Sequence, residues 1–153
     1  MTLHTKTQAV LGIDPGKSGA FALISPGNEQ VSVHDFTEFN DVVKLLSGYD
    51  IRHAFIEKVH AMPGQGVCSM FSFGENFGTW KGILIALQIP FTQVAPQTWK
   101  KSMLKDMPKE KSSSVQRCLQ LYPQMVDSFK RKKDHNRADA ILIASYGKLV
   151  LKI

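Results

Sequence analysis

Three carboxylates occupy positions where an ordinary core would hold an apolar residue. Asp14 ends one apolar run, Glu57 ends a second, and Asp139 lies one turn inside an apolar helical segment. Acidic side chains are almost never fully buried unless a partner compensates their charge. The nearby sequence offers no matching set of buried cations. A divalent metal ion is the economical partner for three such acids, because hard cations prefer carboxylate oxygens.

Each acid also has a plain structural interpretation. Asp14 either binds metal beside a glycine turn that admits a phosphate, or caps its own loop over Pro15–Gly19. Glu57 is either a ligand or an exposed acid at a strand end, paired with Lys58. Asp139 is either a ligand or an acid stabilised by the dipole of its helix. Taken separately, the three motifs leave these alternatives open.

A fourth ligand is expected close to Asp139. Helical periodicity puts His135 and Asn136 one turn earlier on the same face, so either can reach a shared site. Asp134 is a further candidate ligand, or else the residue that caps this helix. The sequence leaves the choice among these three residues open.

The elements that must position these acids follow from hydrophobic patterning and turn residues. Strands are predicted at Gln8–Asp14, Gly19–Ile24, Gln30–Phe36, Arg52–Glu57 and Phe91–Val94. Helices are predicted from Asn40 (as the cap) to Ser47, over Ser69–Gln88, from Pro96, over Lys111–Leu121 and over His135–Val150. Short connections predict that the first three strands form an antiparallel meander. The fold class is therefore α/β, a mixed five-stranded sheet of that meander plus parallel strands, flanked by helices.

The bulk properties are those of one packed, cytosolic domain. The 153 residues, 43% of them hydrophobic, suit a single domain over 1–153 with one core. No run is long enough to span a membrane, and the N-terminus lacks the apolar stretch of a secretion signal. Cys68 and Cys118 fit no metal-binding spacing and are expected to be reduced structural thiols.

Positive charge gathers in the C-terminal part of the chain. Residues 1–95 contain 6 Lys and Arg against 8 Asp and Glu, whereas residues 96–153 contain 13 against 5. This asymmetry favours nucleic acid as a partner, although a solvated basic surface would carry the same charge. In the loop after the fourth strand, His60 and Met62 are suited to stacking on exposed bases. Lys100 and Lys111 are candidate phosphate contacts at the site. The other candidate DNA contacts are Lys17, Lys58, Lys101, Lys130, Arg131, Lys132, Lys133 and Arg137.

A glycine stripe runs along the long central helix. Gly74, Gly78 and Gly82 recur every four residues, and each costs roughly 1 kcal/mol relative to alanine. Close packing on the sheet would explain the stripe. The alternative is a helix–helix contact between two copies of the chain, assisted by Phe73, Phe77 and Trp80.

Together the motifs resemble the RuvC-type Holliday junction resolvases of the ribonuclease H-like superfamily. The resemblance runs from about Val10 to Ser145 and rests on several segments in the family's order. These segments are Gly12–Gly16, Ile56–Val59, Val94–Lys100, Lys109–Ser112 and Ala138–Ala140. The small size and the Met62–Gly66 loop resemble phage or prophage members, which would work in a bacterial or phage-infected cytoplasm.

The resemblance implies a homodimer that cuts two opposed strands of a four-way DNA junction. It implies two Mg²⁺ ions per site, about 3.5–4 Å apart, for which Mn²⁺ substitutes. Asp14 would bridge them, with Glu57 and Asp139 as further ligands, leaving 5′-phosphate and 3′-hydroxyl ends. Lys100 and Lys111 match the family's active-site lysines. Asn136 departs from the pattern, because the family usually has Asp or His there.

Three other functions are each compatible with part of the sequence. An actin-like ATPase or sugar kinase has a similar first turn but needs a second lobe, for which the chain is too short, so no nucleotide cofactor is expected. A non-catalytic DNA-binding module would explain the charge but not the three acids. A nuclease of the same fold with broader branched-DNA or flap specificity stays open.

Overall fold

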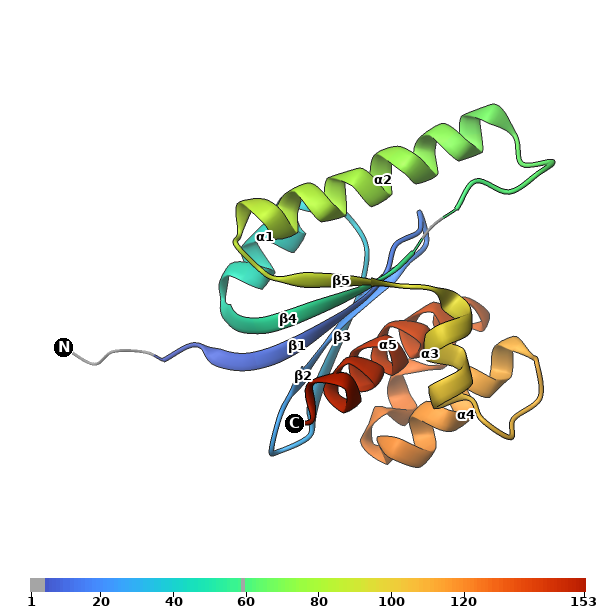
Figure 1. The fold of residues 1–153 in the computed structure, drawn as a ribbon. Helices are drawn as coiled ribbons and strands as arrows, with labels where there is room; N and C mark the ends of the chain where they lie inside the picture. The colour runs from blue at the N-terminus through green and yellow to red at the C-terminus, as the bar shows by residue number, and fades with distance from the viewer. Residues whose placement is uncertain (1–4, 59) are drawn as a thin grey trace.

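The computed structural model describes residues 5–58 and 60–153 (Figure 1). The elements are β1 (Thr7–Asp14), β2 (Ala20–Ser25), β3 (Gln30–Asp35), α1 (Phe39–Ser47), β4 (Tyr49–Glu57), α2 (Val67–Ala86), β5 (Phe91–Val94), α3 (Pro96–Met103), α4 (Lys111–Leu121), the 3₁₀ turns η1 (Pro123–Ser128) and η2 (Lys132–Asp134), and α5 (His135–Leu151). All the strands and helices predicted from sequence are present, with ends shifted by at most a few residues.

The sheet is mixed, as predicted. Its strand order is β3-β2-β1-β4-β5. The pairs β1–β2 and β2–β3 are antiparallel, which confirms the meander. The pairs β1–β4 and β4–β5 are parallel. Helix α2 connects β4 to β5, whereas the chain from β1 to β4 passes through β2, β3 and α1. The two acid-bearing strands, β1 and β4, are therefore neighbours in the middle of the sheet.

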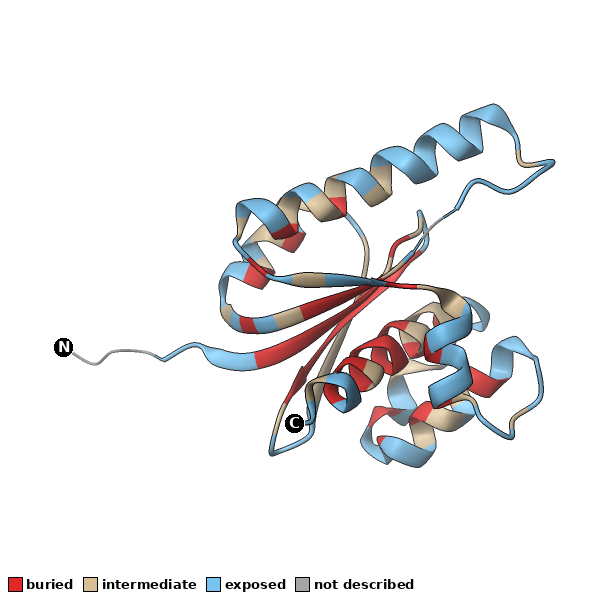
Figure 2. Ribbon diagram, in the orientation of Figure 1, coloured by how far each residue is buried: buried red, intermediate tan, exposed pale blue. Residues whose placement is uncertain are grey.

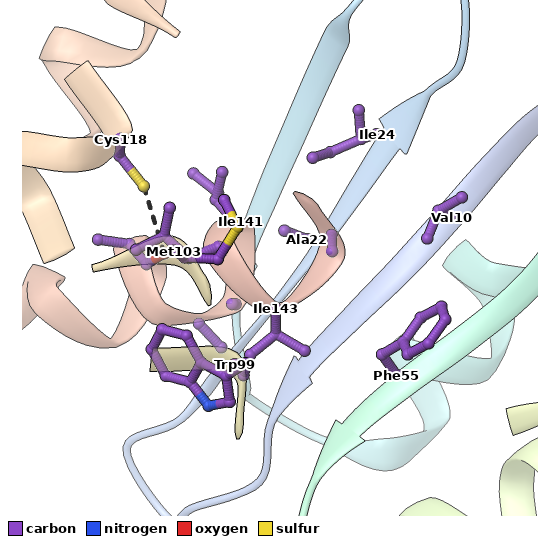
Figure 3. Close-up of a cluster of buried hydrophobic side chains, with 14 of the residues drawn as sticks. Val10, Ala22, Ile24, Phe55, Trp99, Met103, Cys118, Ile141 and Ile143 are labelled. Carbon is purple, nitrogen blue, oxygen red and sulfur yellow. Dashed lines mark hydrogen bonds between the residues drawn. The ribbon is translucent and has the colours of Figure 1, made fainter. Parts of the chain in front are cut away.

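Helices cover both faces of this sheet. In Figure 1, α1 and α2 lie on one side, and α3, α4 and α5 lie on the other. Strand side chains alternate between the two faces. In β1, Leu11 and Ile13 join the core beneath α1 and α2, whereas Val10 joins the core against α5. Figure 3 shows the core between the sheet and α5, in which Phe55 of β4 and Trp99 of α3 are buried.

Helix α2 is supported by the sheet along only part of its length. Its buried residues are Trp80 and Leu84, and the half that begins at Val67 is exposed (Figure 2). Trp80 is 0% exposed and packs against Phe21, Phe36 and Phe39 of the core. The prediction that Trp80 belongs to a dimer contact is therefore wrong.

The glycine stripe on α2 faces away from the sheet. A Cβ atom added to Gly74, Gly78 or Gly82 would meet no atom within 4 Å. Packing on the sheet does not explain these glycines, because nothing in the described chain approaches them. The surface is flanked by the exposed side chains of Phe71 and Phe73.

Two smaller expectations concern helix ends and membrane spans. Asn40 does not cap α1, because the helix already begins at Phe39 and Glu38 flanks it without a side-chain hydrogen bond. Pro96 occupies the first turn of α3, as expected. Within the described residues, no helix combines the length and apolar character needed to cross a membrane.

Candidate active site

Asp14 and Glu57 adjoin at the carboxyl end of the sheet. Ile13 of β1 is in register with Ile56 of β4, so the next residue on each strand is an acid. Parallel neighbours lie about 4.8 Å apart. Strand alternation directs both acids to the face covered by α5, the face that also receives Val10. The predicted meeting of these two acids at one sheet edge is confirmed.

Helix α5 brings the third acid to the same edge. It crosses β1 in direct backbone contact, because a Cβ atom at Gly12 would collide with the backbone of Ala140 and Ala144. Both alanines are fully buried in this contact. Asp139, which precedes Ala140, is thereby held beside the end of β1. The glycine in the first motif is required for this close approach of the helix.

The three acids repel one another. Burial, followed by the charges of Asp139 and Glu57, raises the pKa of Asp14 well above its usual value. Burial also raises the pKa of Glu57, with a further contribution from Asp139. Burial raises the pKa of Asp139 as well. Buried carboxylates that lie close together have raised pKa values when no metal offsets their charge. We call these three residues the acid site.

Two neutral donors hold the acid site in place, and sequence reasoning missed both. The indole Nε1 of Trp99, a 0% exposed residue of α3, donates to Glu57 Oε2 at 2.7 Å. The Oγ of Ser114 on α4 donates to Asp139 Oδ1 at 2.5 Å. Each donor occupies one oxygen of its carboxylate. A buried indole N–H needs an acceptor, and this need is the only sequence signal that could have suggested the first pair.

Several predicted site residues gather around the acids. The charge of Lys100 lowers the pKa of Asp14, Glu57 and Asp139, so this side chain is close to the whole acid site. The charge of His135 likewise lowers the pKa of Asp139. Lys111 lines a cavity that also contains His135 and Asp139.

Asn136 binds the turn that follows Asp14. Its Nδ2 donates to the carbonyl of Ser18 at 2.8 Å, which fastens the start of α5 to the turn that follows Asp14. The amide therefore acts as a clamp on this turn, and its Oδ1 is the atom left for any ligand role.

Asp134 does not join the acid site. It is 2% exposed, and its oxygens accept hydrogen bonds from the backbone N–H of Arg131 at 2.7 Å and from the Arg131 guanidinium at 2.9 Å. Its side chain does not cap α5 either. The hydrogen bonds to Arg131 lower the pKa of Asp134 against the effect of burial. Asp134 is thus a structural acid, and the structure contradicts its prediction as a metal ligand.

Arg131 and Arg137 are committed to the same structural network. Arg137 Nε donates to Asp35 Oδ1 at 2.7 Å, and Arg131 Nη2 contacts Asp35 Oδ2 at 2.7 Å. Nε of Arg137 also lies 3.6 Å from Oδ1 of Asp134. We call Asp35, Arg131, Asp134 and Arg137 the ion network. It joins the end of β3 to the start of α5, so both arginines form ion pairs within the protein, and the DNA contacts predicted for them stay predictions.

The other predicted DNA contacts are accessible at the surface. Lys130 is exposed, and its Nζ lies 3.4 Å from Oδ1 of Asp127, which is also exposed. Lys132 and Lys133, in η2, are exposed. The remaining exposed residues of this group are Lys17, Lys58, His60, Met62 and Lys101.

The donor chemistry of the acid site suits a hard divalent cation. Carboxylates that bind metal are commonly held by hydrogen bonds to their second oxygen, as Glu57 and Asp139 are here. None of the three acids has a salt-bridge partner among the described residues. In that part of the chain, no three His, Cys, Asp or Glu side chains are already arranged as a ligand group. The residue types therefore fit a metal, whereas the side-chain positions are not those of a closed ligand set.

Comparisons with known proteins give a sequence relative of limited extent. No established family profile matches the chain. The chloroplastic Holliday junction resolvase MOC1 of Chlamydomonas reinhardtii is 27% identical over 94 residues, which is 61% of this chain but 11% of that protein. The chain therefore spans only a small part of the length of this curated relative.

Solved structures match over nearly the whole chain. Thermus thermophilus RuvC superposes with a TM-score of 0.66 at 11% identity, over 94% of this chain and 96% of RuvC. RuvC in complex with a Holliday junction substrate gives 0.63 at 10% identity, with the same coverage. The yeast mitochondrial Holliday junction resolvase Ydc2 gives 0.55 at 18% identity, over 93% of this chain and 78% of Ydc2. The chain therefore shares the fold of these structures, which is the fold class that its motifs predicted.

Proposed function

We propose that this protein is a metal-dependent endonuclease that resolves four-way DNA junctions by paired nicks. The observation that carries the proposal is the acid site: three carboxylates from β1, β4 and α5 meet at one edge of the sheet, their pKa values are raised, and none forms a salt bridge with a described residue. Such an arrangement costs stability, so it is expected only where a function requires it. The RuvC-like fold and the resolvase relative support this substrate class.

Asp14, Glu57 and Asp139 would hold the metal, proposed to be two Mg²⁺ ions with Mn²⁺ as a substitute. His135 or the free oxygen of Asn136 would complete the ligand set. When bound, such ions supply an activated water as the nucleophile and stabilise charge on the leaving oxygen. Trp99 and Ser114 would keep one oxygen of Glu57 and of Asp139 turned aside, so that the other oxygen faces the ligand position.

The protein's own cations would act on the phosphate. Lys100 is close to all three acids, so it reduces their mutual repulsion and can pair with a phosphate oxygen on the scissile strand. In the proposed reaction, a water oxygen bonds to phosphorus and the bond from phosphorus to the 3′-oxygen breaks. The products carry a 5′-phosphate and a 3′-hydroxyl, and Lys111 is available for the same strand.

Two opposed nicks need two acid sites, so we propose that the protein acts as a homodimer. The glycine stripe of α2 supports this assembly, because it is open in the single chain and flanked by the exposed Phe71 and Phe73. A bulky side chain at Gly78 should give a monomer in light scattering, while the same change at the exposed Gly66 should leave the dimer intact. A wild-type protein that is monomeric at high concentration would remove this part of the proposal.

The main test compares three DNA substrates. A four-way junction, a Y-shaped fork and a linear duplex are incubated with the protein in Mg²⁺ and in chelator. The proposal expects metal-dependent paired nicks in the junction and little cutting of the duplex. Equal cutting of fork and junction would favour a broader branched-DNA nuclease. Binding without cutting in any metal would favour a non-catalytic DNA-binding module.

A further inference from the structure

A groove beside the acid site is lined mostly by positively charged side chains. It lies between α3 and α4, has a volume of about 760 Å³, and reaches Asp139 and Ser114. Five lysines line it: Lys100, Lys101, Lys105, Lys109 and Lys111. None of them forms a salt bridge with any described residue. Besides Asp139, the only acid lining the groove is Glu110, whose carboxylate accepts a hydrogen bond from Ser112.

The groove also has an apolar wall. Leu104, Met107 and Pro108, from the loop between α3 and α4, line it together with the lysines. Phosphate binding alone needs no apolar surface, because phosphates are bound by cations and N–H groups. The flat face of a nucleic-acid base does need one, and such a face is available only where the base is unstacked.

This wall is built in advance. The guanidinium of Arg117 donates from Nε to the carbonyl of Met103 at 2.9 Å and from Nη2 to that of Lys105 at 3.0 Å. The hydroxyl of Ser113 donates to the carbonyl of Pro108 at 2.6 Å. Residues at both ends of the loop are therefore fastened to α4. A surface that is held rigid before binding loses little conformational entropy when a ligand arrives.

We propose that this groove binds an unpaired nucleotide of a DNA strand. The phosphates lie along the lysines, and the base lies against Leu104, Met107 and Pro108. Because the groove reaches Asp139, the bound nucleotide is close to the phosphate that is cut. The inference deepens the proposed nuclease function and rests on it for the identity of the polymer. It adds Lys105 and Lys109 to the DNA-contacting residues and assigns a role to the α3–α4 loop.

The first experiment asks whether a base is recognised. A short fluorescent oligothymidine and a strand of equal length and charge with abasic positions are titrated with wild-type protein in chelator, and anisotropy is followed. The oligothymidine should bind roughly fivefold more tightly or better, since contact with one base contributes on the order of 1 kcal/mol. Equal affinity for the two strands would overturn the proposal.

Variants separate the wall from the lysines. Met107→Ser should abolish the preference for the strand with bases and leave the salt dependence of binding unchanged. Lys105→Ala with Lys109→Ala should keep the preference and lower the slope of log K against log salt by about 1.4, at about 0.7 per phosphate contact. The matched control is Lys6→Ala with Lys44→Ala, which removes the same charge away from the groove. An equal fall in slope for the control pair would refute a dedicated groove.

These binding measurements need no cleavage, so the two proposals can fail separately. If the protein prefers strands with bases but never cuts junctions, the groove proposal is supported and the nuclease proposal is contradicted. If it cuts junctions but binds abasic strands equally well, only the groove proposal is contradicted. Circular dichroism of each variant verifies folding, and the wild-type comparison requires no variant.

Discussion

The acid site and the ion network use the same kind of residue for opposite purposes. Asp139 and Asp134 lie five residues apart at the start of α5. The hydrogen bonds of Arg131 lower the pKa of Asp134, whereas burial raises the pKa of Asp139, which has only a serine as a hydrogen-bond donor. The carboxylate charges are paired in the ion network and unpaired in the acid site. The comparison teaches that an acid's partners, and not its burial, distinguish a structural carboxylate from a functional one.

The largest expected effect is on cleavage. Asp14→Asn preserves the shape of the side chain and removes a charge that the proposed metal would need, so junction cleavage should fall on the order of 10³-fold. Junction affinity, measured by gel shift in chelator, should stay near the wild-type value. Asp134→Asn is the matched control in the ion network, and its cleavage rate per folded molecule should be unchanged. An active Asp14→Asn protein would remove the distinction between the two regions.

The next effect is on stability and concerns the ion network. Asp134→Asn takes a shared acceptor from Arg131 and Arg137, and it should lower the free energy of unfolding by about 2 kcal/mol. Urea denaturation measures the change. Asp127→Asn breaks an exposed pair with Lys130 and should leave the stability unchanged. If both variants behave alike, the network is no more important than a surface ion pair.

A third effect tests the neutral donors of the acid site. Ser114→Ala frees an oxygen of Asp139 and should weaken Mg²⁺ binding by about 10–100-fold. The readout is the Mg²⁺ concentration needed to raise the melting temperature, which does not depend on catalysis. Ser112→Ala loses only an exposed hydrogen bond to Glu110 and serves as the control. An unchanged Mg²⁺ titration for Ser114→Ala would show that the serine does not position its carboxylate for metal.

The smallest effect is on the pH dependence of stability, which should have opposite signs for the acid site and the ion network. With the metal chelated, the raised pKa values of the acid site mean that the folded protein binds protons more tightly than the unfolded chain. Stability should therefore fall as pH rises from about 4 through these raised values. Asp35 and Asp134 have lowered pKa values, so their stabilisation is present above about pH 4 and is lost as pH falls further.

Urea denaturation in chelator across this pH range checks that difference. In Asp14→Asn, the free energy of unfolding should fall by about 1 kcal/mol less as pH rises, because one of the repelling charges is gone. Asp134→Asn should instead reduce the fall in the free energy of unfolding at low pH. If the Asp14 variant follows the wild-type curve throughout, the raised pKa of Asp14 has no consequence for folding.

Local sequence patterns predicted the strands and the acid site well. Alternation of apolar residues identified β1 and β4, and the parallel pairing of these strands necessarily brings Asp14 and Glu57 together. The position of Asp139 followed from the periodicity of α5. These predictions succeeded because each depends on residues that are close in sequence or on one common strand arrangement.

The partners of the acids could not be predicted in this way. Trp99 and Glu57 are 42 residues apart, and Arg137 and Asp35 are 102 apart, so no local pattern links them. Trp80 was assigned to the wrong surface because α2 has apolar residues on several faces and period alone does not say which face meets the sheet. Asp134 was misread because its partner, Arg131, appeared in the sequence as one more member of a basic run.

The contact between Gly12 and Ala140 has a consequence for anyone who would transplant this chemistry. It fixes the third carboxylate through main-chain contact, with no side chain available to absorb an error. Grafting the three acids onto another parallel sheet would therefore fail unless the glycine and the small residues of the crossing helix were transferred with them.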